Sequence, residues 1–250
     1  MALPVNHHPP HRRAAGCDRR PDQGRREGAG PGAGARRAGE GGAVSREGAR
    51  RLEEIAFDVE KPEEGFRVLL ADPPWSFITR SDRGKGRSPD KHYSTMTLAE
   101  IGDMPVRFLM ARDAHCFLWT TGPHLPMAFD IMQAWGFRYS GMGFVWVKLR
   151  ARERDAIFLT DDSFHMGMGY TTRKNAEFCL LGRRGQPKRL RKDVRELIVS
   201  ARRQHSRKPD EVYRRIEAYC DGPRLELFGR QQRPGWTVWG NETDKFKEAA

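Results

Sequence analysis

The stretch from Arg67 to Trp75, RVLLADPPW, joins a short apolar run to an acid, two prolines and a tryptophan. Val68 to Ala71 has the length and the apolar composition of a strand that is buried on both faces of a parallel sheet. Asp72 follows at once, so the acid lies at the carboxyl end of that strand, where open α/β sheets bind their ligands. The stretch therefore predicts an α/β fold with a binding crevice beside Asp72.

Asp72, Pro73, Pro74 and Trp75 have the chemistry to orient an aromatic amine, whose lone pair is delocalised into its ring. A carboxylate and a backbone carbonyl that accept the two amino hydrogens localise that lone pair, and Asp72 and Pro73 offer both acceptors. The prolines stiffen the loop, and we expect its carbonyls not to be engaged by its own amides. Trp75 offers a flat face to a base outside its stack. The alternative is a rigid turn with a half-buried tryptophan.

These four residues resemble the catalytic tetrad of amino-group methyltransferases. Together with the Leu-Leu-Ala before them, they are similar to the mRNA adenosine N6-methyltransferases (the MT-A type, named for a seventy-kDa subunit) and their bacterial and phage relatives. The resemblance implies a Rossmann-like fold that uses S-adenosylmethionine, with a central, mostly parallel sheet flanked by helices. The implied reaction is methyl transfer to the exocyclic N6 amine of adenine in nucleic acid, for which no metal is needed.

Composition divides the chain of 250 residues into two parts. The first 50 residues hold 10 Gly, 5 Pro and 10 Arg and no aromatic residue, so they bury too little apolar surface to offset the entropy of ordering. We expect a disordered Gly/Ala/Arg-rich arm at residues 1–50 and a single methyltransferase domain at residues 51–250. The chain shows no secretory signal or membrane span, which favours a cytoplasmic protein, and its four cysteines lack zinc-site spacing.

The formal charge of +12 is concentrated locally. The arm contributes +5, and residues 183–208 hold 11 Lys or Arg against two acids, so the remainder of the chain is slightly acidic. A local positive segment is typical of contact with a phosphate backbone. We therefore predict that Arg189, Arg191 and Lys192 contact nucleic acid, the alternative being a solvated basic loop.

Periodicity and composition predict the other elements. Thr97 and Glu100 form the capping-box pattern of a helix start, and apolar residues recur at helical spacing between Thr121 and Gly136. A short helix is expected at residues 51–55, and the polar segment 81–91 suits either a lid over the site or an inert insertion. Buried strands are predicted at residues 114–120, 143–149, 178–182, 193–200 and 224–228.

Lys208 is the first predicted cofactor contact. It precedes a helix that is expected to begin with Pro209 at its first position and acids in its first turn. A cation beside the unpaired amides of a helix N-terminus makes a receptor for a carboxylate. The resembled family has Lys-Pro-Asp at this place, which implies that Lys208 binds the amino-acid end of S-adenosylmethionine.

The resemblance implies further contacts. Gly229 lies 157 residues after Asp72, so the cofactor motif follows the catalytic motif and the order is permuted relative to ordinary methyltransferases. The implied cofactor residues are Asp72, Lys208, Phe228, Gly229, Arg230, Gln232, Asn241 and Glu242, the last two for the ribose hydroxyls. The candidate substrate contacts are Tyr93, Lys174, Asn175 and Glu177. For Tyr93 the alternative is packing beneath the lid, and for Glu177 it is solvation or pairing with a neighbouring Arg.

Several alternatives stay open on sequence alone. An acid-Pro-Pro-aromatic pattern can also serve the amine of cytosine or a glutamine amide, and a non-catalytic nucleic-acid-binding subunit is a second alternative. We expect DNA as the polymer, because the chain is compact and shows no zinc finger or accessory domain, with RNA as the alternative. A homodimer or heterodimer is compatible with the resemblance, but no residue identifies a partner.

Overall fold

The computed structural model describes residues 57–76, 96–167, 169, 172–204 and 207–246. All of them belong to one compact unit, Ala43–Ala250. The predicted arm, the helix expected at residues 51–55, the polar segment 81–91 and Tyr93 lie outside the described residues. The helices and strands, in chain order, are β1 (Phe66–Ala71), α3 (Leu98–Asp103), α4 (Val106–Leu109), β2 (Met110–Thr120), η2 (Gly122–His124), α5 (Leu125–Ala134), β3 (Arg138–Leu149), η3 (Ala151–Glu153), η4 (Asp161–Ser163), β4 (Ala176–Arg184), β5 (Leu197–Ala201), α6 (Glu211–Tyr219), β6 (Arg224–Leu227) and β7 (Thr237–Trp239).

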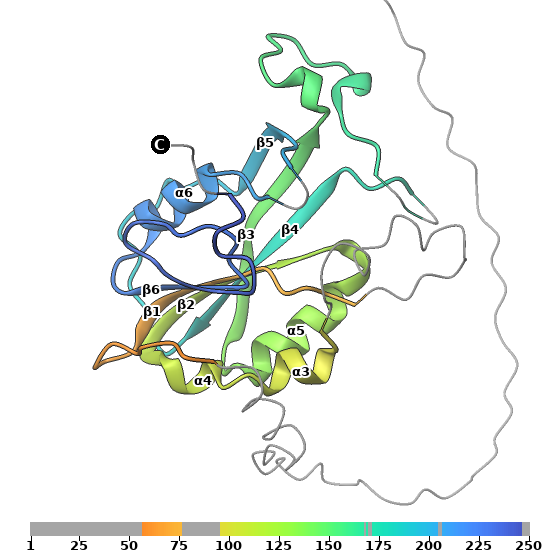
Figure 1. Ribbon diagram of the computed structural model, residues 1–250. Helices are drawn as coiled ribbons and strands as arrows, with labels where there is room; N and C mark the ends of the chain where they lie inside the picture. The colour runs from red at the N-terminus through yellow and green to blue at the C-terminus, as the bar shows by residue number, and fades with distance from the viewer. Residues whose placement is uncertain (1–56, 77–95, 168, 170–171, 205–206, 247–250) are drawn as a thin grey trace, which may run out of the picture. The chain divides into compact units, whose positions relative to one another are not determined.

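The strands form one seven-stranded sheet in the order β5-β3-β4-β2-β1-β6-β7 (Figure 1). The pairs β1–β2, β1–β6, β6–β7 and β3–β5 are parallel, whereas β4 is antiparallel to both β2 and β3. Six described strands therefore run in one direction and β4 runs in the other. The predicted Rossmann-like fold with a mostly parallel sheet is confirmed.

Strand β1 is buried on both faces, as its continuous apolar sequence predicts. Phe66, Leu69 and Ala71 join the core that includes residues of α3 and α5. Val68 and Leu70 point the other way, into the core that includes residues of α6. Because successive side chains of a strand alternate between faces, β1 is packed between two helical layers and its end, Asp72, is held rigidly.

Most predicted element boundaries are close to the observed ones. The Thr97 side chain accepts the Glu100 amide and the Glu100 carboxylate accepts the Thr97 amide, so the capping box is confirmed. Helix α5 follows a 3₁₀ turn and ends before Gly136, whose φ of 84° favours glycine. Helix α6 begins at Glu211, so Pro209 lies in the preceding turn and is not the first helical residue.

Four strands, β2, β3, β4 and β5, differ from the prediction by two residues or more at one end or both, and β4 spans Ala176–Arg184. β2 begins at Met110, which pairs with Phe66 of β1, and β3 begins at Arg138, which pairs with Arg183 of β4, so both strands begin earlier than expected. β5 begins at Leu197, and residues 193–196 precede it. Tertiary pairing, which the local pattern does not contain, sets these ends.

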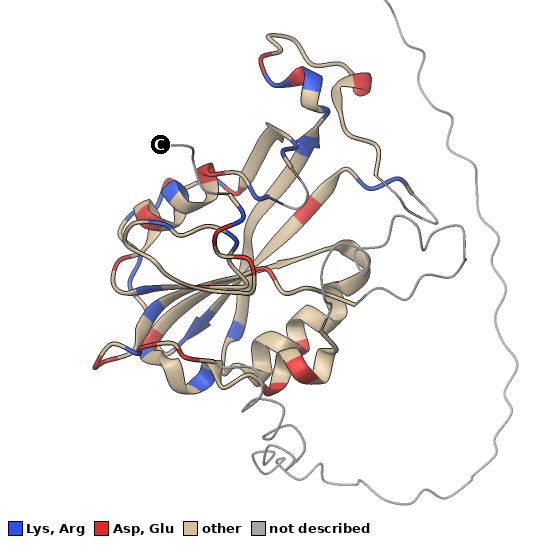
Figure 2. Cartoon of the chain, viewed as in Figure 1, with Lys and Arg blue, Asp and Glu red and all other residues tan. Residues whose placement is uncertain are grey.

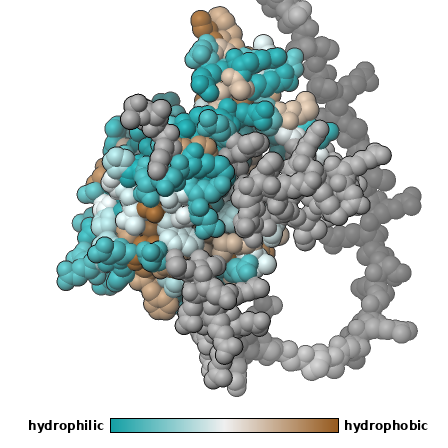
Figure 3. Space-filling model, viewed as in Figure 1, coloured by the Kyte–Doolittle hydropathy of each residue, from teal (hydrophilic) through white to brown (hydrophobic). Residues whose placement is uncertain are grey.

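The surface shown in Figure 3 is mainly hydrophilic over the described residues. In the segment between β3 and β4, Ile157 and Phe158 are 89% and 87% exposed. Among the described residues, no helix combines the length and the apolar character needed to cross a bilayer.

Candidate active site

The ends of several strands meet at one edge of the sheet. Asp72 follows β1, Thr121 follows β2 and Phe228 follows β6, and these three strands are parallel. Strand β4 runs in the opposite direction, so its first residues, including Glu177, lie at the same edge. The topology thus brings together side chains that are far apart in sequence.

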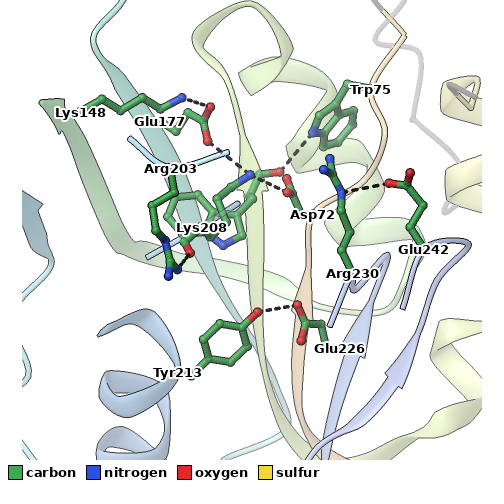
Figure 4. Close-up of polar contacts among 11 residues, drawn as sticks. Asp72, Trp75, Lys148, Glu177, Arg203, Lys208, Tyr213, Glu226, Arg230 and Glu242 are labelled. Carbon is green, nitrogen blue, oxygen red and sulfur yellow. Dashed lines mark hydrogen bonds and ion pairs between the residues drawn. The ribbon is translucent and has the colours of Figure 1, made fainter. Parts of the chain in front are cut away.

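Four charged side chains form a continuous chain at this edge (Figure 4). Lys208 Nζ lies 2.5 Å from Asp72 Oδ2 and 3.3 Å from Glu177 Oε2. Glu177 also accepts a hydrogen bond from Lys148. The signs alternate from Asp72 through Lys208 and Glu177 to Lys148, which compensates the cost of holding these charges away from water.

The pKa shifts follow from this alternation. Burial lowers the pKa of Lys208, but the Asp72 and Glu177 carboxylates raise it by more, so its pKa lies above the ordinary value. Burial raises the pKa of Glu177, but Lys208 and Lys148 lower it by more, so its pKa lies below the ordinary value. Both residues are therefore charged at neutral pH, and the site keeps a cation between two carboxylates.

The segment before α6 fixes the position of Lys208. Arg203 donates to the Lys208 carbonyl at 2.6 Å and to Asp210 Oδ2 at 2.6 Å. Arg233 donates to the other Asp210 oxygen at 2.9 Å. Arg203 precedes Asp210 in the chain and Arg233 follows it, and both bind the Asp210 carboxylate. These charge-assisted hydrogen bonds stabilise the turn that carries Lys208.

The carbonyls of the Asp-Pro-Pro-Trp loop are engaged, contrary to the prediction. Trp75 N donates to Pro73 O at 2.9 Å, and Met96 N donates to Pro74 O at 3.1 Å. The prolines have no N–H of their own, but the Trp75 and Met96 amides can still donate to the proline carbonyls. A carbonyl has two lone pairs, so Pro73 O retains one for an amine.

The Trp75 side chain is buried, whereas the sequence predicted an exposed face for a base. Its side chain is 5% exposed, and its indole Nε1 donates to Trp119 O at 3.2 Å. The His124 ring stacks on the indole with centroids 5.5 Å apart and 18° between planes. The prediction that Trp75 offers a free face to the base is wrong, because His124 and the core occupy its surroundings; Trp75 instead anchors the loop.

The loops after β6 and β7 cross closely beneath the predicted cofactor residues. Phe228 has a φ of 63°, which is rare for a residue with a side chain. Gly229 N donates to Trp239 O at 3.0 Å, and a side chain on Gly240 would come within 2.4 Å of Gly229 O. A side chain on Gly240 would collide with the Gly229 backbone, and one on Gly229 would come within 2.3 Å of the Val238 side chain, so both positions favour glycine.

The other predicted cofactor residues surround this crossing. Arg230 Nε lies 3.6 Å from Glu242 Oε2, and Gln232 N donates to Thr243 O at 3.1 Å. The Gln232 and Asn241 side chains are exposed. Hydrogen bonds and an ion pair thus join the two ends of segment 228–243, and Arg230 of this segment lines a cavity with Asp72.

A cavity joins the two halves of the site. Asp72 and Lys208 line it together with Phe228 and Arg230. Its volume is about 40 Å³, because Arg207, Gln231 and Phe246 also line it. Arg207 donates to Gln231 at 2.9 Å, and its guanidinium lies 5.1 Å from the Phe246 ring centroid. A cofactor the size of a nucleoside requires these side chains to move aside.

Comparison with known proteins identifies the family. Residues 66–242 match the family model described as MT-A70. The chain belongs to the MT-A70 family. The predicted family and the predicted class of enzyme, a methyltransferase, are thereby confirmed.

Relatives within the MT-A70 family come from bacteria and eukaryotes. The type II methyltransferase M.MunI of a Mycoplasma species is 30% identical over 199 residues, which cover 72% of this chain and 79% of the relative. The N(6)-adenosine-methyltransferase MT-A70-like protein of Drosophila melanogaster is 32% identical over 73% of this chain and 28% of the relative. The human N(6)-adenosine-methyltransferase catalytic subunit METTL3 is 31% identical over 72% of this chain and 28% of the relative.

The predicted substrate contacts of this MT-A70 chain fall into two groups. Lys174 and Asn175 directly precede β4, so they lie at the Asp72 edge with Glu177. The basic segment with Arg189, Arg191 and Lys192 lies at the opposite edge, where Leu190 N donates to Tyr219 O at the end of α6. Arg191 is also paired with Asp193 at 2.5 Å. The structure does not bring these three side chains to Asp72, because α6 spans the sheet between the two edges.

Sequence reasoning missed five polar residues near this edge of the sheet: Lys148, Arg203, Tyr213, Glu226 and His124. Lys148 and Glu226 lie within apolar strand patterns, where a single polar residue facing the core gives a weak signal. Arg203 lies within the basic segment, where nothing distinguishes it from its neighbours. A charged residue one or two positions from the end of a predicted strand is the sequence signal that could have identified Lys148 and Glu226.

Proposed function

We propose that the protein transfers the methyl group of S-adenosylmethionine to the N6 amine of adenine in DNA. The contact between Asp72 and Lys208 is the observation that carries the proposal. These residues lie 136 positions apart, and their predicted roles concern the acceptor and the cofactor, respectively. Their 2.5 Å contact supports a single site in which amine and methyl donor meet.

The proposed roles follow from donors and acceptors. S-adenosylmethionine supplies a methyl group on a sulfonium, which is already activated, so alignment is the main task of the protein. Asp72 Oδ2 is bonded to Lys208, and no described residue donates to Asp72 Oδ1. Asp72 Oδ1 accepts one amino hydrogen and Pro73 O the other, which directs the nitrogen lone pair toward the methyl group.

Lys208 would bind the carboxylate of the cofactor. An ammonium has three donors, and Asp72 and Glu177 engage two of them. The third remains for a further carboxylate. Glu242 and Asn241 would hold the ribose hydroxyls, and Lys174 and Asn175 would contact the nucleic acid beside the flipped base.

DNA is the preferred polymer because the match covers most of a compact bacterial methyltransferase and only about a quarter of the eukaryotic relatives. RNA is the alternative, since those eukaryotic relatives are named N(6)-adenosine methyltransferases. We retain the cytoplasm as the proposed compartment. We also retain a homodimer or heterodimer as the proposed assembly.

The test is expression in a host that lacks adenine methylation, followed by separate digestion of DNA and RNA and mass spectrometry of the nucleosides. We expect N6-methyladenine in DNA with the wild-type chain and none with Asp72→Ala. N6-methyladenine in RNA alone would show that the polymer is RNA and not DNA. A methylated cytosine would show that the base is cytosine and not adenine. A chain that binds S-adenosylmethionine and modifies neither polymer would instead be a non-catalytic subunit.

A further inference from the structure

The Asp-Pro-Pro-Trp loop depends on anchors outside its prolines. Pro73 and Pro74 have no N–H, so neither can donate to the sheet, and contacts of the residues that follow must hold the loop. The Pro73 carbonyl is the proposed acceptor for the amine, and its direction depends on how those residues are held. The groups next in the chain are the Trp75 side chain and the Ser76 carbonyl.

His124 contacts both of these groups. It is the last residue of η2, the turn that follows β2, and it lies 48 residues after Ser76. Its Nε2 lies 3.1 Å from Ser76 O, and its ring stacks on the Trp75 indole with centroids 5.5 Å apart. His124 is 5% exposed, so little water reaches these contacts. One side chain from the end of the neighbouring strand therefore binds Trp75 and Ser76 together.

Thr121 fixes the orientation of the His124 ring. The Thr121 hydroxyl oxygen lies 2.9 Å from His124 Nδ1. A carbonyl only accepts, so Nε2 carries the proton and donates to Ser76 O, and Nδ1 of the neutral ring accepts from the hydroxyl. Burial lowers the pKa of His124 by more than the hydrogen bond to Ser76 raises it, so the ring is neutral at neutral pH. Both ring nitrogens thus have defined roles.

We propose that His124 is a positioning residue for methyl transfer, which holds the loop so that the Pro73 carbonyl stays beside Asp72. This inference rests on the proposed function and deepens it. Trp75 also donates through its indole to Trp119 O at 3.2 Å, but that bond holds only the ring, whereas His124 also binds the chain beyond it. Strand β1 fixes Asp72, and His124 fixes the second acceptor relative to it.

The test compares His124→Ala with His115→Ala in a labelled-methyl transfer assay, below the Tm of both variants. His115 is also 5% exposed and contacts an aromatic ring, that of Tyr219, but it pairs with Val68 near the start of β1, away from Asp72. We expect His124→Ala to lower kcat by at least about tenfold and to leave the affinity for the product S-adenosylhomocysteine within about twofold. His115→Ala should retain the wild-type kcat.

Two conservative variants separate the contacts of His124. His124→Gln can still donate to Ser76 O, whereas His124→Phe keeps a ring on Trp75 and loses both hydrogen bonds. We expect His124→Gln to recover part of kcat and His124→Phe to resemble His124→Ala, because the bond to Ser76 fixes the chain. A His124→Gln variant no more active than His124→Ala would remove the Ser76 bond from the positioning role.

Hydrogen exchange with mass spectrometry gives a readout that needs no reaction. The Trp75 amide, which donates to Pro73 O at 2.9 Å, should exchange faster in His124→Ala and at the wild-type rate in His115→Ala. Wild-type kcat in His124→Ala, or an equal loss of kcat in both alanine variants, would overturn the positioning role. If the wild type methylates neither DNA nor RNA, the proposed function is wrong and the positioning role fails with it, an outcome distinct from the first two.

Discussion

The two carboxylate oxygens of Asp72 have different hydrogen-bond partners, one observed and one proposed. Oδ2 is engaged by Lys208, and Oδ1 is the oxygen that we propose accepts an amino hydrogen. Lys208 keeps Glu177 as a partner if Asp72 is removed. The acceptor function of Asp72 is therefore separable from the position of Lys208.

Asp72→Ala should lower kcat by roughly 10²–10³-fold, because one of two acceptors for the amine is removed. The affinity for S-adenosylhomocysteine should change by no more than a few-fold, since Glu177 still holds Lys208. A labelled-methyl transfer assay and a titration measure the two quantities. Wild-type turnover in Asp72→Ala would remove Asp72 from the reaction.

Glu226 should make stability depend on pH in an unusual direction for a carboxyl group. Its pKa is raised from 4.5 to about 7 in the fold, so the folded state retains a proton that the unfolded chain releases. The resulting stability is full below pH 4.5 and is lost as the pH rises toward about 7, by about 3 kcal/mol. Thermal unfolding of the ligand-free protein from pH 5 to pH 8 should show Tm falling in the wild type and falling less in Glu226→Gln; parallel curves would contradict this.

Gly240→Ala should disrupt the crossing of the two cofactor loops. The new methyl group would lie 2.4 Å from Gly229 O and 2.9 Å from Gly229 N, and backbone has no alternative rotamer. We expect a decrease of about 1–3 kcal/mol in stability and weak cofactor binding. Gly235 has a φ of 76° and its added methyl group would meet no atom within 4 Å, whereas Gly240 has no left-handed φ, so Gly235→Ala measures backbone strain without collision in the same assay.

At the scale of elements, the turn before α6 determines how well Lys208 is placed. Arg203 ties the Lys208 carbonyl to Asp210, and Asp210 in turn holds Arg233. Arg202 is the neighbouring residue, and its side chain is exposed. The two arginines carry the same charge, so they offer a matched comparison.

Arg203→Ala should weaken S-adenosylhomocysteine binding by about tenfold, because two hydrogen bonds to the turn are removed and Lys208 becomes less ordered. Arg202→Ala should bind like the wild type. Titration of both variants at equal ionic strength checks this. Equal weakening would show that net charge, rather than the geometry of the turn, governs binding.

At the scale of the whole molecule, basic residues occur at both ends of the sheet (Figure 2). Among the described residues, Arg173 and Lys174 precede β4, whose first residues lie at the Asp72 edge. The Arg189–Lys192 segment is held at the far edge by the hydrogen bond between Leu190 and Tyr219. Charge alone therefore does not identify the surface that binds nucleic acid.

Neutralising Arg173 and Lys174 together should reduce the slope of log K against log salt for DNA binding by about 1.8, roughly 0.9 for each phosphate that is no longer neutralised. Neutralising Arg189 and Lys192 should leave the slope nearly unchanged. Fluorescence anisotropy over a range of salt concentrations measures both. A larger effect of the second pair would show that the basic segment, as its charge predicts, binds the substrate.

The sequence alone determined the family, the apolar β1 strand, the acid at its end and the lysine before α6. These are local features, because a buried strand, a helix start and a short motif are each written in neighbouring residues. Tertiary structure alone decided the reversal of β4, the burial of Trp75, the distant place of Arg189 and the unpaired oxygen of Glu226 among the described residues. Each of these depends on which elements pack together, and packing between distant segments sets the burial and the partners of a side chain.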